Sequence, residues 1–130
     1  MPKNIIDTNL IIRFLVNDDP QKAARVKKVL QESKTANVLP DLVIAEIIWV
    51  LSSYYELDKV SIISKIRALI HVKTVDCNKA LLDQALANWE KYNISFVDAY
   101  LVSVAKLKSL NIYSYDLKFD KVDGVTRIEP

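Results

Sequence analysis

The chain has 130 residues, of which 51% are hydrophobic and 26% are charged, and its formal net charge is +2. This length and composition suit one globular domain with a filled core, and they exclude disordered and fibrous proteins. The weak positive charge permits a polyanionic partner without requiring one.

The counts of three residue types exclude whole classes of chemistry. The single cysteine, Cys77, cannot form an internal disulfide, which suits a reducing compartment. With one glycine, Gly124, the chain has no glycine-rich loop to hold nucleotide phosphates. The single histidine, His71, excludes a two-histidine acid–base ribonuclease and argues against a histidine-ligated zinc site. We therefore expect carboxylates to carry any catalysis.

The sequence gives no sign of a membrane segment. No long apolar stretch precedes Asp7, so we expect no signal peptide. The longest apolar run, residues 42–51 with one interruption, is too short to cross a bilayer. We expect a soluble, cytoplasmic protein without membrane contact.

In the first half of the chain, short β-branched runs alternate with segments of helical spacing. A strand is predicted at residues 4–6, and Asp18-Asp19-Pro20 begins the next helix with an acidic cap and a proline in the first turn. A second strand is predicted at 35–39. Pro40-Asp41 then opens a helix that runs to about residue 55.

The second half repeats this alternation. Asp58 precedes a helix, a strand follows at 72–75, and Asn78 caps a helix that continues through Trp89. Ser95 caps the last long helix, to about residue 110, and strands are predicted at 112–115 and 125–128. Strands that alternate with helices predict an α/β fold with a short parallel sheet flanked by helices. We expect residues 1–130 to form a single domain.

Four of the sixteen acidic residues stand in apolar surroundings. Asp7 and Asp116 each follow a predicted strand, and ligands of open parallel sheets bind at the carboxyl ends of strands. Glu46 is the only charge in residues 42–51, and Asp98 is the only one from 94 to 105. Because neither segment offers a basic partner, a metal ion that neutralises several acids is the simplest one. Carboxylate oxygens are ligands that Mg²⁺ and Mn²⁺ prefer.

Each of the four acids also has a structural interpretation. Asp7 can cap the first helix, and Asp116 can close a turn with the residues that follow it. Asp98 can belong to a capping box that begins at Ser95. Glu46 can lie on a solvated helix face.

Three further features have open roles. Asp120 is either an additional acid of the site or simply exposed. Arg13 is the basic residue best placed to contact a phosphate. Trp49 is expected in the core rather than on a nucleic-acid surface.

Four short segments resemble the motifs of PIN domains. They are Ile5-Ile6-Asp7-Thr8-Asn9, Pro40-Asp41 through Glu46, Phe96-Val97-Asp98-Ala99, and Ser114-Tyr115-Asp116 followed by Phe119-Asp120. Their order and spacing, and the length of the chain, resemble the VapC branch of this family over essentially the whole sequence. Many relatives carry an additional acid where this chain has Ser95, which leaves the number of metal ions open.

The resemblance implies a fold and a site. The fold is an α/β/α sandwich with a short parallel sheet. The implied catalytic and metal-binding residues are Asp7, Glu46, Asp98 and Asp116, with polar support from Thr8, Asn9 and Ser114. The implied cofactor is Mg²⁺ or Mn²⁺.

The resemblance also implies an activity and partners. The activity is hydrolysis of RNA by a metal-activated water, as the toxin component of a toxin–antitoxin pair. The partners are a second copy in a homodimer and a small antitoxin that covers the acidic cleft. We expect the antitoxin on the apolar stripe with Val26 and Leu30 and on the aromatic pair Tyr54 and Tyr55. The alternatives are a PIN nuclease of RNA maturation or DNA processing, and a catalytically weak nucleic-acid-binding scaffold.

Overall fold

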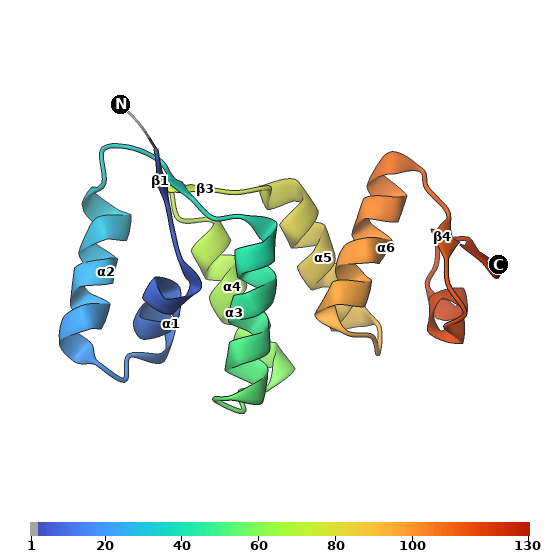
Figure 1. Cartoon of the computed structure of the whole chain (residues 1–130), viewed down its shortest axis with the longest axis horizontal. Coiled ribbons are helices and arrows are strands. Elements are labelled where there is room, and N and C mark those ends of the chain that lie inside the picture. Colours follow the sequence, from blue (N-terminus) through green and yellow to red (C-terminus); the bar gives the residue numbers. More distant parts are fainter. Residues whose placement is uncertain (1–2) are drawn as a thin grey trace. The chain divides into compact units, whose positions relative to one another are not determined.

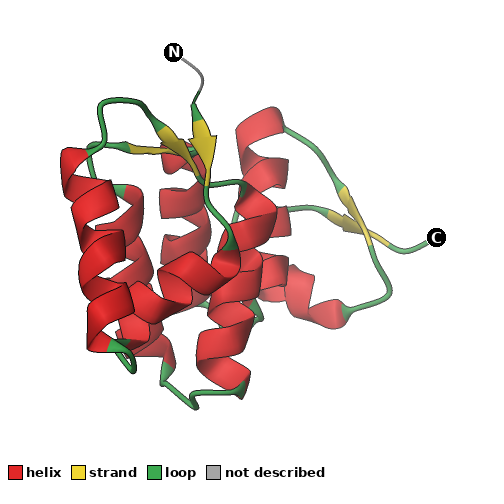
Figure 2. Cartoon of the chain, turned by 60° about the vertical axis from the view of Figure 1, so that its left-hand side comes forward, coloured by secondary structure: helices red, strands yellow, loops and turns green. Residues whose placement is uncertain are grey.

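The computed structural model describes residues 3–130 and has an α/β fold (Figures 1 and 2). The helices and strands, in chain order, are β1 (Asn4–Ile5), α1 (Thr8–Val16), α2 (Pro20–Glu32), β2 (Asn37–Val38), α3 (Asp41–Ser53), α4 (Lys59–Ile70), β3 (Val75–Asp76), α5 (Lys79–Lys91), α6 (Phe96–Lys108), β4 (Ile112–Tyr113), the 3₁₀ helix η1 (Leu117–Lys121) and β5 (Arg127–Ile128). The chain forms two compact units, Met1–Lys79 (unit 1) and Ala80–Pro130 (unit 2).

Unit 1 contains a three-stranded parallel sheet in the order β1-β2-β3. Asn37 of β2 stands opposite Asn4 on one side and Val75 on the other. Two helices connect each pair of consecutive strands, as parallel pairing requires a crossover connection. The predicted α/β fold, with parallel strands flanked by helices, is confirmed.

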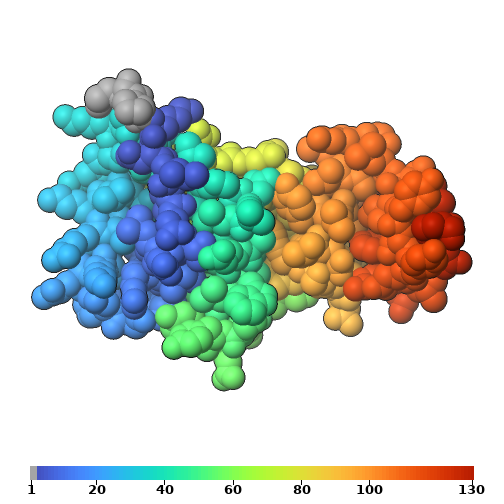
Figure 3. Space-filling view, viewed as in Figure 1, coloured from blue at the N-terminus to red at the C-terminus, as the bar shows by residue number. Residues whose placement is uncertain are grey.

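The helices of unit 1 pack through long aliphatic side chains. Helix α1 contacts both α2 and α3, and α3 contacts α4. In the space-filling view, α1 (dark blue) and α3 (green) lie side by side (Figure 3). Their shared core includes Ile11, Ile44, Ile47 and Leu51, none of which is measurably exposed. This packing fixes the start of α1 against one face of α3.

Unit 2 contains α5, α6 and a pair of parallel strands, β4 and β5. A small apolar cluster of Val102, Phe119 and Val122 joins α6 to η1. The buried Asn88 side chain donates to the Ser103 hydroxyl at 2.9 Å, and that hydroxyl donates to a backbone carbonyl of the same helix at 2.8 Å. The apolar cluster thus holds α6 to the segment after β4, and the Asn88–Ser103 hydrogen bond holds α5 to α6.

The structure corrects several sequence predictions. Each strand has two residues, shorter than the predicted run, because pairing to its neighbour ends there. Val26 and Leu30 are only 3% exposed and belong to the core of unit 1, so they form no docking stripe. Trp49, expected in the core, is 67% exposed on α3. None of the helices within residues 3–130 combines the length and apolarity needed to span a bilayer.

Candidate functional site

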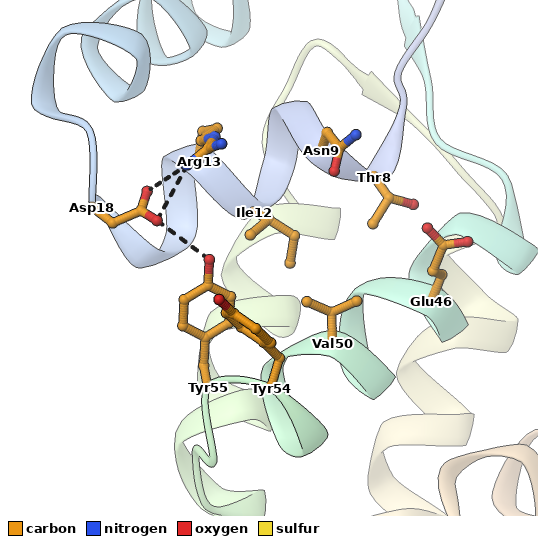
Figure 4. A pocket seen from close by; sticks show the side chains of 9 residues that line it. All are labelled: Thr8, Asn9, Ile12, Arg13, Asp18, Glu46, Val50, Tyr54 and Tyr55. Atoms are coloured by element: carbon orange, nitrogen blue, oxygen red, sulfur yellow. Dashed lines mark hydrogen bonds and ion pairs between the residues drawn. The ribbon is translucent and has the colours of Figure 1, made fainter.

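A pocket of about 300 Å³ lies in unit 1, between α1, α3 and the turn that follows each of these helices. Figure 4 shows Thr8, Asn9 and Glu46 at one end, Arg13, Asp18, Tyr54 and Tyr55 at the other, and Ile12 and Val50 between them. We call the end with Thr8, Asn9 and Glu46 the acidic end. The end with Arg13, Asp18, Tyr54 and Tyr55 is the aromatic end. The two ends of the pocket have different chemistry.

The acidic end begins where β1 passes into α1. Asp7 occupies the N-cap position of α1 with extended backbone angles (φ −83°, ψ 151°), yet its side chain makes no capping hydrogen bond. The capping interpretation of Asp7 is therefore wrong, and its exposed carboxylate is not committed to the helix end. Thr8, directly after it, is buried, whereas Asn9 is exposed and lines the pocket.

Glu46 projects from α3 into the same end of the pocket (Figure 4). Its neighbours Ile44, Ile47 and Ile48 are buried, but Glu46 lies on the solvated face of the helix. The apolar residues that flank Glu46 in the sequence therefore lie on the opposite, buried face of α3. Glu46 needs no partner to compensate burial, and it is accessible to a solute in the pocket.

The aromatic end is organised around Asp18. Nη1 of Arg13 donates to both carboxylate oxygens of Asp18, at 3.3 and 3.2 Å. The Tyr55 hydroxyl donates to Oδ2 of the same carboxylate at 3.3 Å. Burial, and then the Asp18 charge, raise the pKa of the Tyr55 phenol, which keeps this donor protonated. Arg13, predicted to contact phosphate, thus lies at the pocket with its position fixed by Asp18.

In unit 2 the structure brings Asp98 and Asp116 together on one lysine. Nζ of Lys118 lies 3.0 Å from Oδ2 of Asp98 and 2.8 Å from Oδ2 of Asp116. The Lys118 side chain, and then its backbone N–H, hold the pKa of Asp116 below its usual range. The same two carboxylates, Asp116 first, raise the pKa of Lys118.

Sequence reasoning missed Lys118. It looked for a basic partner within residues 94–105 and found none, whereas Lys118 follows Asp98 by twenty residues. Its position two residues after Asp116 is the only local signal that could have suggested it. Asp98 therefore has a protein partner for its negative charge, the ammonium group of Lys118.

Asp98 and Asp116 also take part in the local capping and turn structure that the sequence predicted. The Ser95 hydroxyl accepts from the Asp98 N–H at 3.1 Å, which is the capping bond predicted for Ser95. Oδ1 of Asp116 accepts from the Lys118 N–H at 3.0 Å, so Asp116 caps η1 and closes the predicted turn. Ser114 supports Asp116 by accepting from its N–H at 2.9 Å.

Asp120 is exposed and paired with Arg127. The Nε and Nη2 atoms of Arg127 donate to its two carboxylate oxygens at 2.9 and 3.1 Å. Arg127 also donates to the Ser114 carbonyl at 2.9 Å. Arg127 holds the pKa of Asp120 below its usual range. Both oxygens of Asp120 are thus engaged by a guanidinium.

Two of the four predicted metal ligands lie close together in unit 2, and their carboxylate oxygens are of the kind that a hard divalent cation prefers. Within residues 3–130, no three or more carboxylate, histidine or cysteine side chains stand close enough to form a metal cluster. Asp98 and Asp116 nevertheless converge on one cationic nitrogen, at 3.0 and 2.8 Å. Two carboxylates that share an ammonium ion can share a cation of another kind, and Mg²⁺ and Mn²⁺ prefer such oxygen ligands.

A family model described as the PIN domain matches residues 5–125. No curated protein gives a significant sequence match.

Three solved structures resemble the chain. The VapC20 toxin of Mycobacterium tuberculosis, which cleaves the sarcin–ricin loop, is 19% identical, with 99% of this chain and 100% of that chain covered and a TM-score of 0.44. VapBC2 of Rickettsia felis, bound to a promoter DNA fragment, is 12% identical, with 98% of each chain covered and a TM-score of 0.43. A toxin–antitoxin complex from Klebsiella pneumoniae is 17% identical, with 98% and 99% covered and a TM-score of 0.36.

Proposed function

Because the chain belongs to the PIN domain family, we propose that it is a Mg²⁺- or Mn²⁺-dependent endoribonuclease and the toxin of a toxin–antitoxin pair. The observation that carries the proposal is a set of four carboxylates in the four PIN-like motifs. They are Asp7, Glu46, Asp98 and Asp116. The family model spans both compact units, which supports the further proposal that residues 1–130 work as one PIN domain.

We assign the four acids to one hydrolytic reaction. Asp7 and Glu46 are exposed, and the side chain of Asp7 is not engaged at the helix N-cap, so both are available to bind a cation or orient a substrate. Asp98 and Asp116 already converge on a positive charge. A bound divalent ion would activate water and offset the negative charge that develops on phosphate oxygens. Thr8, Asn9 and Ser114 are proposed as polar support.

An RNA cleavage assay tests this function. The purified chain is incubated with end-labelled RNA and single-stranded DNA in Mg²⁺, in Mn²⁺ and in EDTA. We expect RNA cleavage that requires the metal and is lost in Asp98→Asn. Asp123→Asn, which alters an exposed acid of the same unit outside the motifs, is the matched control and keeps activity.

The other outcomes of this assay contradict the proposal. Cleavage of DNA in preference to RNA would favour a DNA-processing nuclease. RNA binding without cleavage in either metal would favour a nucleic-acid-binding scaffold.

We also propose a homodimer and a small antitoxin as partners, on the strength of the motif resemblance. Co-expression with the product of an adjacent reading frame tests the proposed antitoxin partner. We expect a complex that co-purifies and has no RNA cleavage until the antitoxin is removed. A chain that is neither bound nor inhibited by that product is not the toxin of the pair. We further propose that the protein is cytoplasmic, because its proposed substrate is RNA and its single cysteine, Cys77, cannot form a disulfide within the chain.

A further inference from the structure

The aromatic end of the pocket offers an exposed aromatic ring. Tyr54 is 76% exposed and lies against Tyr55 edge-to-face, with ring centroids 4.8 Å apart and planes at 76°. In this geometry the edge contact with Tyr55 leaves a face of the Tyr54 ring open to a planar ligand. A base can stack on such a face whatever its sequence identity.

The backbone around Tyr54 is well ordered by hydrogen bonds. The Tyr54 N–H donates to the Val50 carbonyl at 2.9 Å, which continues the last turn of α3. The chain then turns through Glu56 at φ 54°, and the Leu57 N–H closes the turn on the Leu51 carbonyl at 3.0 Å. The position of the Tyr54 backbone is thus fixed, and a tyrosine side chain, with only two torsions, loses little conformational entropy when a ligand binds.

Arg13 lines the same end of the pocket as the two tyrosines, and its guanidinium is ion-paired with Asp18. Both of its hydrogen bonds to Asp18 use Nη1, and a guanidinium carries five N–H donors. Its Nε and Nη2 donors are therefore available for a phosphate, to which a guanidinium fork binds well. Asn17, at φ 57°, turns the chain after α1 and positions Asp18 to hold Arg13 and Tyr55 together.

We propose that the aromatic end is a subsite for one unpaired nucleotide of the RNA substrate. The Tyr54 ring stacks on the base, and Arg13 binds an adjacent phosphate. This inference rests on the proposed function and deepens it, because Glu46 lies at the other end of the same pocket. The whole pocket, both ends together, has a volume of about 300 Å³, at the small end of ligand sites.

The lining favours RNA over a protein partner. Most of the side chains at the two ends are polar or charged, with Ile12 and Val50 as the apolar residues between them. A groove that receives a helix from a partner protein presents an apolar surface instead. An aromatic ring next to a cation is the combination that binds single-stranded nucleic acid.

Binding of RNA to the metal-free protein tests whether a base stacks on the Tyr54 ring. Fluorescence anisotropy is measured with a labelled single-stranded RNA hexanucleotide in EDTA, so that no cleavage occurs. We expect Tyr54→Ala to weaken binding by about tenfold and Tyr54→Phe to bind as the unaltered chain does. Tyr113→Ala is the matched control, because Tyr113 is 74% exposed and lies in β4, outside the pocket.

The salt dependence of RNA binding tests whether Arg13 binds a phosphate group. The double variant Arg13→Gln/Asp18→Asn removes one charge of each sign and so keeps the net charge. We expect its slope of log K against log salt to fall in magnitude by about 0.7, the value for one phosphate contact on a single strand. Tyr54→Ala should keep the slope of the unaltered chain, because stacking releases no counterions.

A parallel cleavage assay in Mg²⁺ separates this inference from the proposed function. If RNA is cleaved but Tyr54→Ala binds and cleaves normally, the subsite is wrong and the function stands. If RNA binds through Tyr54 but is never cleaved, the function fails and the subsite stands. Equal losses in Tyr54→Ala and Tyr113→Ala, or no RNA binding at all, would overturn the subsite. So would a Tyr54→Ala variant that keeps RNA affinity and loses only a protein partner.

Discussion

Two acidic residues at helix N-caps differ by one hydrogen bond. Asp58 caps α4 and accepts from the Ser61 N–H at 2.8 Å. Asp7 has the equivalent position on α1, but its carboxylate accepts no such bond. A residue that occupies a cap position without capping is not explained by helix stability.

We expect opposite effects from mutating these two residues. Asp7→Asn should abolish RNA cleavage and leave the free energy of unfolding nearly unchanged, since no capping bond is lost. Asp58→Ala should keep cleavage and lower the free energy of unfolding by about 1 kcal/mol, the usual contribution of a cap. Urea denaturation and the cleavage assay measure the two quantities. A large loss of stability in Asp7→Asn would mean that its role is structural.

Lys118 is the second residue whose role follows from its contacts. Its ammonium group stands where Asp98 and Asp116 converge, at 3.0 and 2.8 Å, so it offsets one of the two negative charges of the pair. A divalent cation that uses the same two carboxylates must displace this ammonium group. Lys118 holds the two carboxylates near one another and would compete with a metal ion for them.

We expect Lys118→Met to increase the stabilisation of the chain by Mn²⁺. In EDTA the variant should melt at a lower temperature, because the two carboxylates repel each other without a partner. Added Mn²⁺ should raise its melting temperature by more than it raises that of the unaltered chain, since ligands stabilise the state they bind. Lys121→Met, at the end of the same 3₁₀ helix, is the control. Equal Mn²⁺ shifts in all three proteins would place the metal away from Lys118.

At the scale of elements, local signals predicted the helix starts well. Asp19 accepts from the Lys22 N–H at 3.2 Å, and the capping bonds of Asp58 and Ser95 are also present. These bonds span three residues, so the sequence contains all that is needed to anticipate them. Strand lengths were overestimated because pairing depends on a partner strand far along the chain. β2, for example, pairs with β1 and β3 over two residues only.

The central strand β2 contains an unsatisfied polar side chain. Asn37 is fully buried, and neither its amide nitrogen nor its carbonyl oxygen has a hydrogen-bond partner among residues 3–130. We expect Asn37→Val to raise the free energy of unfolding by about 1 kcal/mol or more, because a buried polar group without a partner is destabilising. Valine also favours strand conformation. Urea denaturation measures the change, and a destabilised variant would show that the amide is hydrogen-bonded.

The contact between η1 and β5 predicts a pH dependence. Arg127 of β5 holds the pKa of Asp120 below its ordinary value of 3.8. As the pH falls, Asp120 is therefore protonated at a higher pH in the unfolded chain than in the folded chain. The stabilisation is complete above pH 3.8 and is lost as the pH drops through the lower pKa of the folded state.

Thermal melts of Asp120→Asn and the unaltered chain at different pH values test this dependence. At neutral pH the variant should melt at a lower temperature. Below pH 3.8 the difference between the two proteins should shrink as the pH falls. Asp123→Asn should match the unaltered chain throughout. A difference that grows in acid would contradict the assigned direction of the pKa shift.

At the scale of the whole molecule, sequence reasoning found the candidate acids but not their surroundings. The motifs around Asp7 and Asp116 are continuous in sequence, so they could be recognised without a structure. The partners of the acids could not, because Lys118 meets Asp98 only after α6 and β4 have folded. The same holds for Tyr55 and Asp18, which are 37 residues apart. Tertiary contacts of this kind have no local signature.

The chemistry of the whole chain also predicts the products of cleavage. One route to RNA cleavage uses the 2′-hydroxyl as nucleophile, with a general base and a general acid, and leaves a cyclic or 3′-phosphate. Histidine suits these roles because its pKa lies near neutrality. This chain has one histidine, His71, which follows α4 and belongs to none of the four motifs. The other route attacks phosphorus with water, needs carboxylates and a divalent ion, and leaves 5′-phosphate and 3′-hydroxyl ends.

The four carboxylates favour the second route, so we expect 5′-phosphate products, no activity in EDTA, and recovery when Mg²⁺ or Mn²⁺ is restored. A substrate with a single 2′-deoxy sugar at the cleavage site should still be cut, because the 2′-hydroxyl takes no part in the reaction. Its cleavage is slower only where that hydroxyl contributes to binding. His71→Ala should retain activity. The ends are identified by mass spectrometry and by ligation that requires a 5′-phosphate. A 2′,3′-cyclic phosphate as the primary product would refute this mechanism while leaving the fold intact.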